Sequence, residues 1–170
     1  MVALTRSLGD SGRVTHAPTP IVHPLPPWMR LALDDAHAAA AVGEVPVGAV
    51  VVRDGVVVGR GANAPRTTHD PTAHAEIVAI RAAAAALGSD RLEGCDLFVT
   101  LEPCAMCAGA IAHARIARLY YGASDPKGGA VEHGPRFFTQ PTCHHRPEVY
   151  GGILEGEAGE LLRGFFAGKR

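Results

Sequence analysis

Apolar residues along this chain follow two periods, and the first to appear is helical. After residue 27, apolar side chains recur every three or four positions, and Gly43 follows where such a helix would end. The positions that set this spacing are Met29, Leu33, Ala36 and Ala40. The pattern predicts a helix that opens a folded domain near Trp28.

Residues 1–27 have a different composition. They carry Gly, Ser and Thr, and then prolines at positions 18, 20, 24, 26 and 27. Such a composition favours extended or disordered chain over packing. We therefore expect a disordered or extended N-terminal tail over residues 1–27 and one domain over residues 28–170, a length typical of a single domain.

Short β-branched runs show the second period and predict strands. Residues 47–52 and 56–58 are rich in valine and flank Asp54-Gly55, a strong hairpin turn because both positions tolerate positive φ. Residues 97–101 and 116–121 predict two more strands, and a helix entered through proline joins them over 103–115. Two strands joined in this way form a right-handed βαβ unit.

Two further helices and one long loop complete the pattern. Asp70 suits an N-cap and Pro71 the first helical position, so we expect a helix from there to Leu87, with residues 74 and 76 in its first turns. Residues 122–147 predict a long loop and residues 155–166 an amphipathic helix. Helices that alternate with a mixed sheet define an α/β layered domain.

Charge and cysteine content narrow the class of protein. The 170 residues include 16 Lys and Arg against 17 Asp and Glu, so no global positive field recruits a polyanion, and a nucleic-acid partner needs a local basic patch. The apolar runs fall short of the roughly 18 residues of a membrane span, and residues 1–27 lack the apolar core of a signal peptide. Four cysteines fit a reducing compartment better than a disulfide framework. We expect a cytoplasmic protein.

The residues that carry chemistry gather in two motifs, His-Ala-Glu at 74–76 and Pro-Cys-Ala-Met-Cys at 103–107. Cys104 and Cys107 share one face of a helix, whose N-terminus lowers the pKa of their thiols. With His74 they offer three zinc ligands, and a catalytic zinc site keeps its fourth position for water. Residues i and i+2 lie about 200° apart on a helix, so spacing alone does not predict that Glu76 meets His74.

Other interpretations of these motifs exist. Cys-x-x-Cys beside a βαβ unit also occurs as a thioredoxin-like redox pair. A closed structural zinc site would need a fourth ligand, for which Cys95, Cys143 and the histidines are available. A helical glutamate is usually solvated, and His144 and His145 are more typical of solvent-facing positions than of ligands, so we leave both histidines out of the metal site.

H-x-E combined with P-C-x-x-C is the signature of zinc-dependent nucleobase deaminases. Longer segments around it resemble the bacterial tRNA-specific adenosine deaminases, over roughly residues 28–170. The resemblance implies a cytidine deaminase-like fold, a three-layer α/β/α sandwich with a mixed central sheet of about five strands. The matching segments are EVPVGAV at 44–50, DPTAHAEI at 70–77, TLEPCAMCAGA at 100–110 and RGFF at 163–166.

The same resemblance implies a cofactor, a reaction and partners. One Zn²⁺ per subunit is held by His74, Cys104 and Cys107, and it lowers the pKa of its bound water from about 15.7 to roughly 7. Glu76 takes that proton and delivers protons to purine N1 and to the departing ammonia. The implied substrate is the wobble adenosine, position 34 of a tRNA anticodon loop, which becomes inosine. The implied assembly is a homodimer.

Three substrate-binding residues also follow from the resemblance. Asn63 would read the flipped base with its amide, although it is also a plausible turn residue. Asp125 would lie at a ribose 2′-hydroxyl, although Asp-Pro is also a routine turn signal. Phe165 would lie near the anticodon loop, where stacking is useful, although residues 161–166 also carry a core-facing apolar stripe. Residues 128–135 depart from the family pattern, which bears on substrate choice.

Two rival functions share parts of this description. A free-base deaminase, such as one that acts on guanine, has the same zinc signature and fold, and a near-neutral charge fits either enzyme. The extended motif over 102–110 and the paired phenylalanines at 165 and 166 favour tRNA. A non-catalytic zinc-stabilised interaction module would require Glu76 to be dispensable.

Overall fold

A five-stranded mixed sheet organises the protein, for which the computed structural model describes residues 27–169. The predicted tail over residues 1–27 therefore lies outside the described residues, apart from Pro27. The strand order is β2-β1-β3-β4-β5, with antiparallel pairing of β1 to β2 and β3, and parallel pairing of β4 to β3 and β5. The strands are β1 (Gly48–Arg53), β2 (Val56–Ala62), β3 (Cys95–Leu101), β4 (Arg118–Ala123) and β5 (Glu148–Tyr150).

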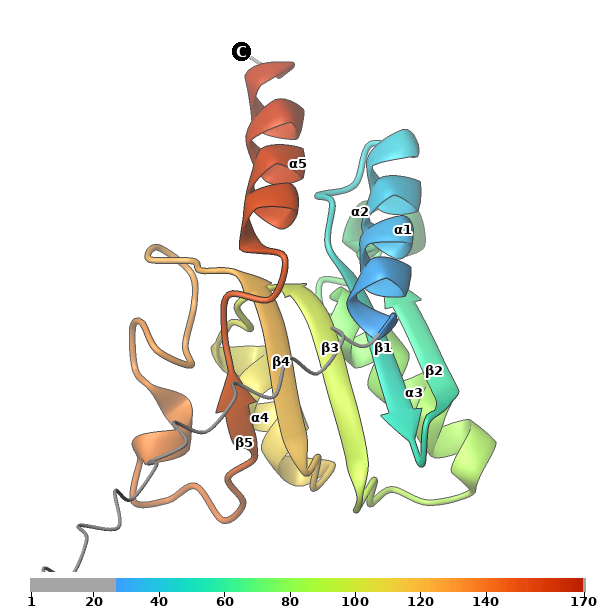
Figure 1. The fold of residues 1–170 in the computed structure, drawn as a ribbon, viewed down its shortest axis with the longest axis vertical. Helices are drawn as coiled ribbons and strands as arrows, with labels where there is room; N and C mark the ends of the chain where they lie inside the picture. Colours follow the sequence, from blue (N-terminus) through green and yellow to red (C-terminus); the bar gives the residue numbers. More distant parts are fainter. Residues whose placement is uncertain (1–26, 170) are drawn as a thin grey trace, which may run out of the picture.

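Helices cover both faces of this sheet (Figure 1). Helices α3 and α4 lie on one face, and α1 and α5 lie on the other, where α5 rises beyond the end of the sheet. The predicted three-layer α/β/α sandwich with about five strands is confirmed. The helices are α1 (Trp28–Ala41), α2 (Pro65–Thr68), α3 (Ala75–Leu87), α4 (Ala105–His113) and α5 (Glu155–Ala167), with a 3₁₀ turn over Phe137–Thr139.

Strand alternation divides the core between the two faces. Val51, Leu97 and Leu119 belong to the cluster that contains the buried residues of α3 and α4. Val50 and Phe98 face the other way and pack with Met29 of α1. Because the side chains of a strand point to opposite faces in turn, both faces of β1 and β3 are buried, as their near-continuous apolar runs require.

The hairpin and the parallel connection follow the sequence pattern. Asp54 and Gly55 adopt φ values of 50° and 77°, the left-handed conformation that a tight hairpin between β1 and β2 requires. Strands β3 and β4 are parallel and joined through α4, so the predicted βαβ connection is confirmed. Gly61 of β2 lies so close to α3 that an added Cβ would stand 2.3 Å from the carbonyl oxygen of Ala75. This contact seats the start of α3 against the sheet.

The predicted start of one helix is wrong, and one strand was not located from the sequence. Helix α3 begins at Ala75 and not at Pro71, because the Asp70 carboxylate accepts hydrogen bonds from the backbone N–H and hydroxyl of Thr72 and closes a local turn instead. Strand β5 lies after the long predicted loop, and its three residues are too few to show a period in the sequence. No helix within residues 27–169 has the length and apolar content to cross a membrane.

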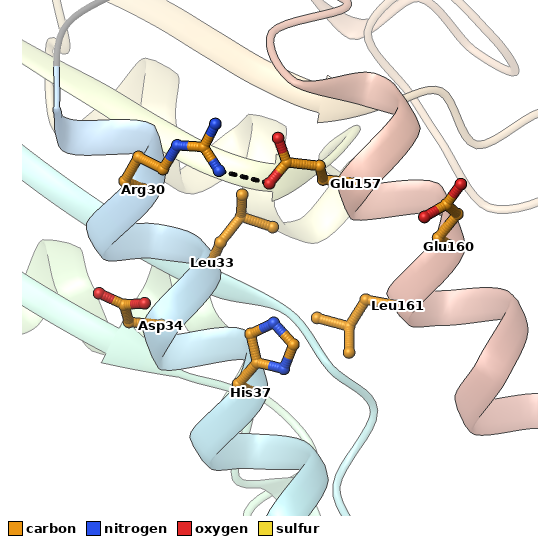
Figure 2. A pocket seen from close by; sticks show the side chains of 7 residues that line it. All are labelled: Arg30, Leu33, Asp34, His37, Glu157, Glu160 and Leu161. Atoms are coloured by element: carbon orange, nitrogen blue, oxygen red, sulfur yellow. Dashed lines mark hydrogen bonds and ion pairs between the residues drawn. The ribbon is translucent and has the colours of Figure 1, made fainter.

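A groove separates α1 from α5 on the outer face (Figure 2). Its volume is about 450 Å³, and Arg30 of α1 forms an ion pair across it with Glu157 of α5. Acidic side chains line much of the rest. The complete lining is Arg30, Leu33, Asp34, His37, Glu157, Glu160 and Leu161.

Candidate active site

A second pocket, with a volume of about 300 Å³, opens where β3 and β4 end and where α3 and α4 begin. Ligand sites in α/β proteins form at such carboxyl ends of parallel strands, and the two helix N-termini add partial positive charge. The pocket is lined by Val45, Val47, Asn63, His74, Glu76, Leu101, Glu102, Cys104, Asp125 and Gly128. Six of the seven site residues predicted from the sequence are in or beside it: five line it, and Cys107 contacts His74.

The start of α3 explains how His74 and Glu76 meet. His74 is the N-cap of this helix, with extended backbone at φ −70° and ψ 153°, whereas Glu76 lies in the first helical turn. The 200° separation expected for two helical residues therefore does not apply, because His74 is not helical. Cys104 plays the same part for α4, with φ −74° and ψ 174°, and Cys107 lies in the first turn. In each motif, the first of these two residues is the N-cap and the second lies in the first turn of the same helix.

The three predicted metal ligands converge. Nδ1 of His74 lies 3.6 Å from Sγ of Cys104 and 3.5 Å from Sγ of Cys107. A tetrahedral zinc with bonds of about 2.05 Å to nitrogen and about 2.3 Å to sulfur would separate those atoms by about 3.6 Å. Both nitrogen–sulfur spacings therefore match a tetrahedral zinc site, and all three ligand atoms lie within 4.8 Å of one another.

Within residues 27–169 this cluster is the one group of three or more His, Cys, Asp or Glu side chains whose ligand atoms lie within 4.8 Å of one another. Cys143 Sγ instead donates to the carbonyl oxygen of His145, and Cys95 is buried at the start of β3. Among the described residues, no fourth His, Cys, Asp or Glu side chain joins the cluster to complete a closed site. The described cluster thus has the three protein ligands typical of a catalytic zinc site.

The thiols respond to each other electrostatically. The hydrogen bond with the Cys107 thiol, together with contact with His74, outweighs burial and lowers the pKa of Cys104 to about 4. The same pairing raises the pKa of Cys107, with burial and the nearby Glu76 in support. Zinc ligation would require both sulfurs as thiolates.

Glu76 is a buried carboxyl group beside this cluster. Its residue is only 4% exposed, and burial raises its pKa to about 7, an effect to which the charge of Cys104 adds. The predicted alternative of a solvated helical glutamate is therefore wrong. A carboxyl group that titrates near neutral pH is suited to both accepting and donating a proton.

Asn63 ties the pocket to the start of α3. Its side-chain oxygen accepts a hydrogen bond of 2.9 Å from the backbone N–H of Ala75, one of the N–H groups that a helix start leaves unpaired. The backbone N–H of Asn63 donates to the carbonyl oxygen of Val47, and Val47 also lines the pocket. The amide orientation is thereby fixed, which leaves the NH₂ group as the donor for a ligand.

Asp125 and Phe165 lie in different surroundings. Asp125 lines the pocket, and its side chain also accepts from the backbone N–H groups of Lys127 and Gly128, so the turn interpretation holds as well. Phe165 is half-buried on α5 under the Lys169 ammonium, which lies 3.9 Å from the ring centre. Phe165 is not among the residues that line the pocket.

Two buried carboxylates near the pocket were missed as site residues. Glu44 accepts from the backbone N–H and the hydroxyl of Thr67, and Glu102 directly follows β3. Both are 2% exposed. One signal for Glu102 was present in the sequence: a charged residue directly follows the apolar run of a predicted strand.

The sandwich fold, the three convergent ligands and the buried carboxyl group define a zinc-dependent hydrolytic deaminase site. The profile of the cytidine and deoxycytidylate deaminase zinc-binding region matches residues 25–123 of the chain. The chain belongs to this family. The zinc cofactor predicted from the sequence is confirmed by that match together with the His74, Cys104 and Cys107 cluster.

Individual relatives refine the comparison. The chain is 62% identical over 143 residues to a tRNA-specific adenosine deaminase of Agrobacterium fabrum. The match covers 84% of this chain and 94% of the relative. It is 61% identical, with a TM-score of 0.79, to a structure from a study of A-to-I editing by tRNA:A34 deaminases at the wobble position, and the match covers 79% and 98% of the two chains. A guanine deaminase structure from Bacillus subtilis is 33% identical, with a TM-score of 0.57 over 84% and 91%.

Proposed function

We propose that this protein is a hydrolase that converts the wobble adenosine at position 34 of a tRNA anticodon to inosine. The observation that carries the chemistry is the cluster of His74, Cys104 and Cys107 at zinc spacing beside the buried Glu76. The substrate is supported by identity above 60% to a tRNA-specific adenosine deaminase and to a tRNA:A34 deaminase structure. The likeness to guanine deaminase is weaker in both identity and TM-score.

The site residues divide the work. His74, Cys104 and Cys107 would hold zinc, which when bound supplies Lewis-acid chemistry that makes water nucleophilic at neutral pH. Glu76 accepts the proton that this water loses and passes it to purine N1, and then transfers the second water proton to the amino group that leaves as ammonia. The overall balance is adenosine and water to inosine and ammonia.

Substrate contacts come from the pocket walls. The NH₂ group of Asn63 is placed to donate to an acceptor on the purine ring, since its oxygen is held by Ala75. Asp125 also lines the pocket and would accept a hydrogen bond from a ribose hydroxyl. Phe165, outside the pocket, would stack on a neighbouring base of the anticodon loop.

A homodimer is supported by the outer face of α4. The nine residues of this helix include no Asp, Glu, Lys or Arg, yet Ala105 and Met106 are exposed and Met106 is 37% accessible. Exposed apolar side chains on a helix without Asp, Glu, Lys or Arg are suited to contact with a second copy of the chain. Met106→Glu should give a monomer by analytical ultracentrifugation, and Val56→Glu, a matched change at an exposed valine of β2, should leave the dimer intact. A wild-type monomer would contradict the dimer.

Domain extent and location complete the proposal. Residues 28–170 are proposed as the deaminase domain, because the elements from α1 to α5 all contribute to one sheet and its covering helices. A cytoplasmic location is proposed because tRNA is the substrate and zinc-binding thiolates persist in reducing compartments.

The deciding experiment compares substrates. Purified zinc-loaded protein is incubated with an anticodon stem-loop that carries adenosine at position 34, and separately with guanine, while inosine and ammonia are measured. We expect inosine from the stem-loop and no ammonia from guanine. Turnover of guanine alone would reverse the assignment of substrate.

A further inference from the structure

Glu102 lies at the back of the substrate pocket and makes an unusual number of hydrogen bonds. Its Oε1 accepts from the backbone N–H groups of Val131, Glu132 and His133 at 3.2, 2.9 and 3.0 Å. Its Oε2 accepts from the backbone N–H of Asp125 at 2.9 Å and from Nδ1 of the His133 ring at 2.7 Å. The Glu102 side chain has no exposed surface.

This carboxylate differs in kind from Glu76, which lines the same pocket. Four backbone N–H groups and one ring nitrogen contact the two oxygens of Glu102. Backbone N–H groups that converge on one anion form a stable binding site for it. Both oxygens of Glu102 are therefore engaged by residues 125–133, whereas Glu76 lies in the first turn of α3 beside His74.

The segment held by Glu102 supplies one wall of the pocket. Residues 125–133 contain Asp125 and Gly128, both of which line the pocket. Gly129 lies against the carboxylate so closely that an added Cβ would stand 2.5 Å from Cδ of Glu102. The backbone N–H of Ala130 also donates to the carbonyl oxygen of Pro103, next to the metal ligand Cys104. The pocket wall is therefore held against the residues that directly follow β3, next to Cys104.

We propose that Glu102 is a positioning residue for the deamination reaction: its carboxylate holds residues 125–133 in place, so that Asp125 and Gly128 form the substrate-binding wall. The inference rests on the proposed function for the identity of the substrate. The proposal also gives a role to residues 128–135, the segment that departs from the family pattern. His133 belongs to this segment, and its ring is the one side-chain donor to the Glu102 carboxylate among the described residues. Glu102 is not one of the three side chains of the metal-ligand cluster.

The test uses full-length, zinc-loaded protein and three variants. Glu102→Gln keeps the size of the side chain but turns one acceptor oxygen into a donor that faces other donors. His133→Ala removes only the ring contact, and His133 is 36% exposed, so the fold tolerates its loss. Asp96→Asn is the matched control, because Asp96 holds Arg118 through two hydrogen bonds on the sheet, away from the pocket.

Three quantities are measured: zinc content, hydrogen exchange of the amides of residues 131–133, and KM and kcat for the anticodon stem-loop. For Glu102→Gln we expect faster exchange at these amides and a KM raised about tenfold or more, the factor that corresponds to the loss of one charge-assisted hydrogen bond. His133→Ala should shift both quantities in the same direction by less. Zinc content and kcat should stay near wild type, and Asp96→Asn should change neither KM nor exchange at these amides.

A general loss of folded protein lowers the apparent kcat but does not raise KM, so the two effects are separable. Wild-type KM and wild-type exchange in Glu102→Gln would overturn the proposal, as would zinc loss with unchanged exchange, which would make Glu102 a support for Cys104 alone. If wild-type protein fails to deaminate the stem-loop, the proposed function fails, and the exchange contrast still decides whether Glu102 holds the wall.

Discussion

Two hollows of similar size lie on this molecule, and only one of them has the features of an active site. The groove between α1 and α5 is the larger, about 450 Å³, but its lining mixes charged side chains with a histidine and two leucines, and the ion pair of Arg30 with Glu157 bridges it (Figure 2). The pocket at the strand ends is about 300 Å³. Three metal-ligating atoms and a buried carboxyl group converge there. Convergent chemistry, and not volume, marks the site.

The difference lies in what the two walls are made of. The groove is formed by the outer faces of two helices, where polar side chains are solvated and need no fixed partner. The pocket is formed by helix N-termini and strand ends, where His74 and Cys104 cap α3 and α4. Backbone N–H groups at helix starts and extended residues before them place side chains in fixed positions. The contrast can be tested residue by residue.

Removal of a metal ligand should have the largest effect. Cys104→Ala leaves two ligands in place of three, so zinc should be lost and deamination should fall to the uncatalysed level. Zinc per chain, measured by inductively coupled plasma mass spectrometry, checks this. Asp34→Ala in the groove is the control and should keep full zinc. Stoichiometric zinc in Cys104→Ala would remove Cys104 from the metal site.

Removal of the proton carrier should come next. Glu76→Ala should keep zinc and the fold but lower kcat by roughly 10²- to 10⁴-fold, the usual contribution of general acid–base catalysis. Single-turnover deamination of the stem-loop measures the loss. Glu160→Ala, which removes an acidic side chain of the groove, should leave kcat unchanged. Appreciable remaining activity in Glu76→Ala would exclude this role.

Asn63 should separate stability from binding. Asn63→Ala removes the acceptor for the N–H of Ala75, and the loss of such a cap costs about 0.5–2 kcal/mol of the free energy of unfolding. Asn63→Asp keeps an acceptor oxygen but loses the NH₂ donor. We expect Asn63→Asp to melt close to wild type while kcat/KM falls about tenfold or more. Equal kcat/KM in Asn63→Asp and wild type would mean that Asn63 is only a cap.

Phe165 should show a smaller effect confined to RNA binding. Loss of one base-stacking contact costs about 1 kcal/mol at the low end, so Phe165→Ala should raise KM for the stem-loop roughly fivefold. Phe165→Tyr keeps the ring and serves as the control. Fluorescence anisotropy with a labelled stem-loop gives the same comparison as a Kd. An unchanged Kd in Phe165→Ala would leave Phe165 with a packing role only.

The ion pair across the groove should matter least. Arg30 and Glu157 are 61% and 49% exposed, and pairs of this kind contribute about 0.2–1 kcal/mol to the free energy of unfolding. Glu157→Gln should therefore shift urea unfolding slightly and leave kcat and KM unchanged. A large loss of deamination in Glu157→Gln would show that the groove takes part in the reaction.

The sequence predicted the parts of this molecule that depend on local chemistry. The Asp54-Gly55 turn follows from a short-range rule. The two cysteines were expected on one face of a helix, but Cys104 is the extended N-cap of α4 and only Cys107 is helical. The sequence did not predict that His74 and Glu76 meet, because that depends on where α3 begins, and Asp70 closes a turn that delays the helix.

Burial of carboxylates was also beyond local rules. Glu102 is satisfied by N–H groups of residues up to 31 positions away, a contact that only the folded segment creates. Strand β5 likewise exists because β4 offers it an edge, since its three residues carry no period of their own. Long-range contacts therefore determine the burial of Glu102 and the formation of β5, which local sequence patterns do not predict.

The open three-ligand metal centre is the central claim, and X-ray absorption at the zinc edge of active protein tests it most directly. We expect one nitrogen at about 2.0–2.1 Å, two sulfurs at about 2.3 Å and one light atom from solvent. A spectrum with a third sulfur or a second imidazole, or active protein in which the thiols of Cys104 and Cys107 form a disulfide, would contradict the account.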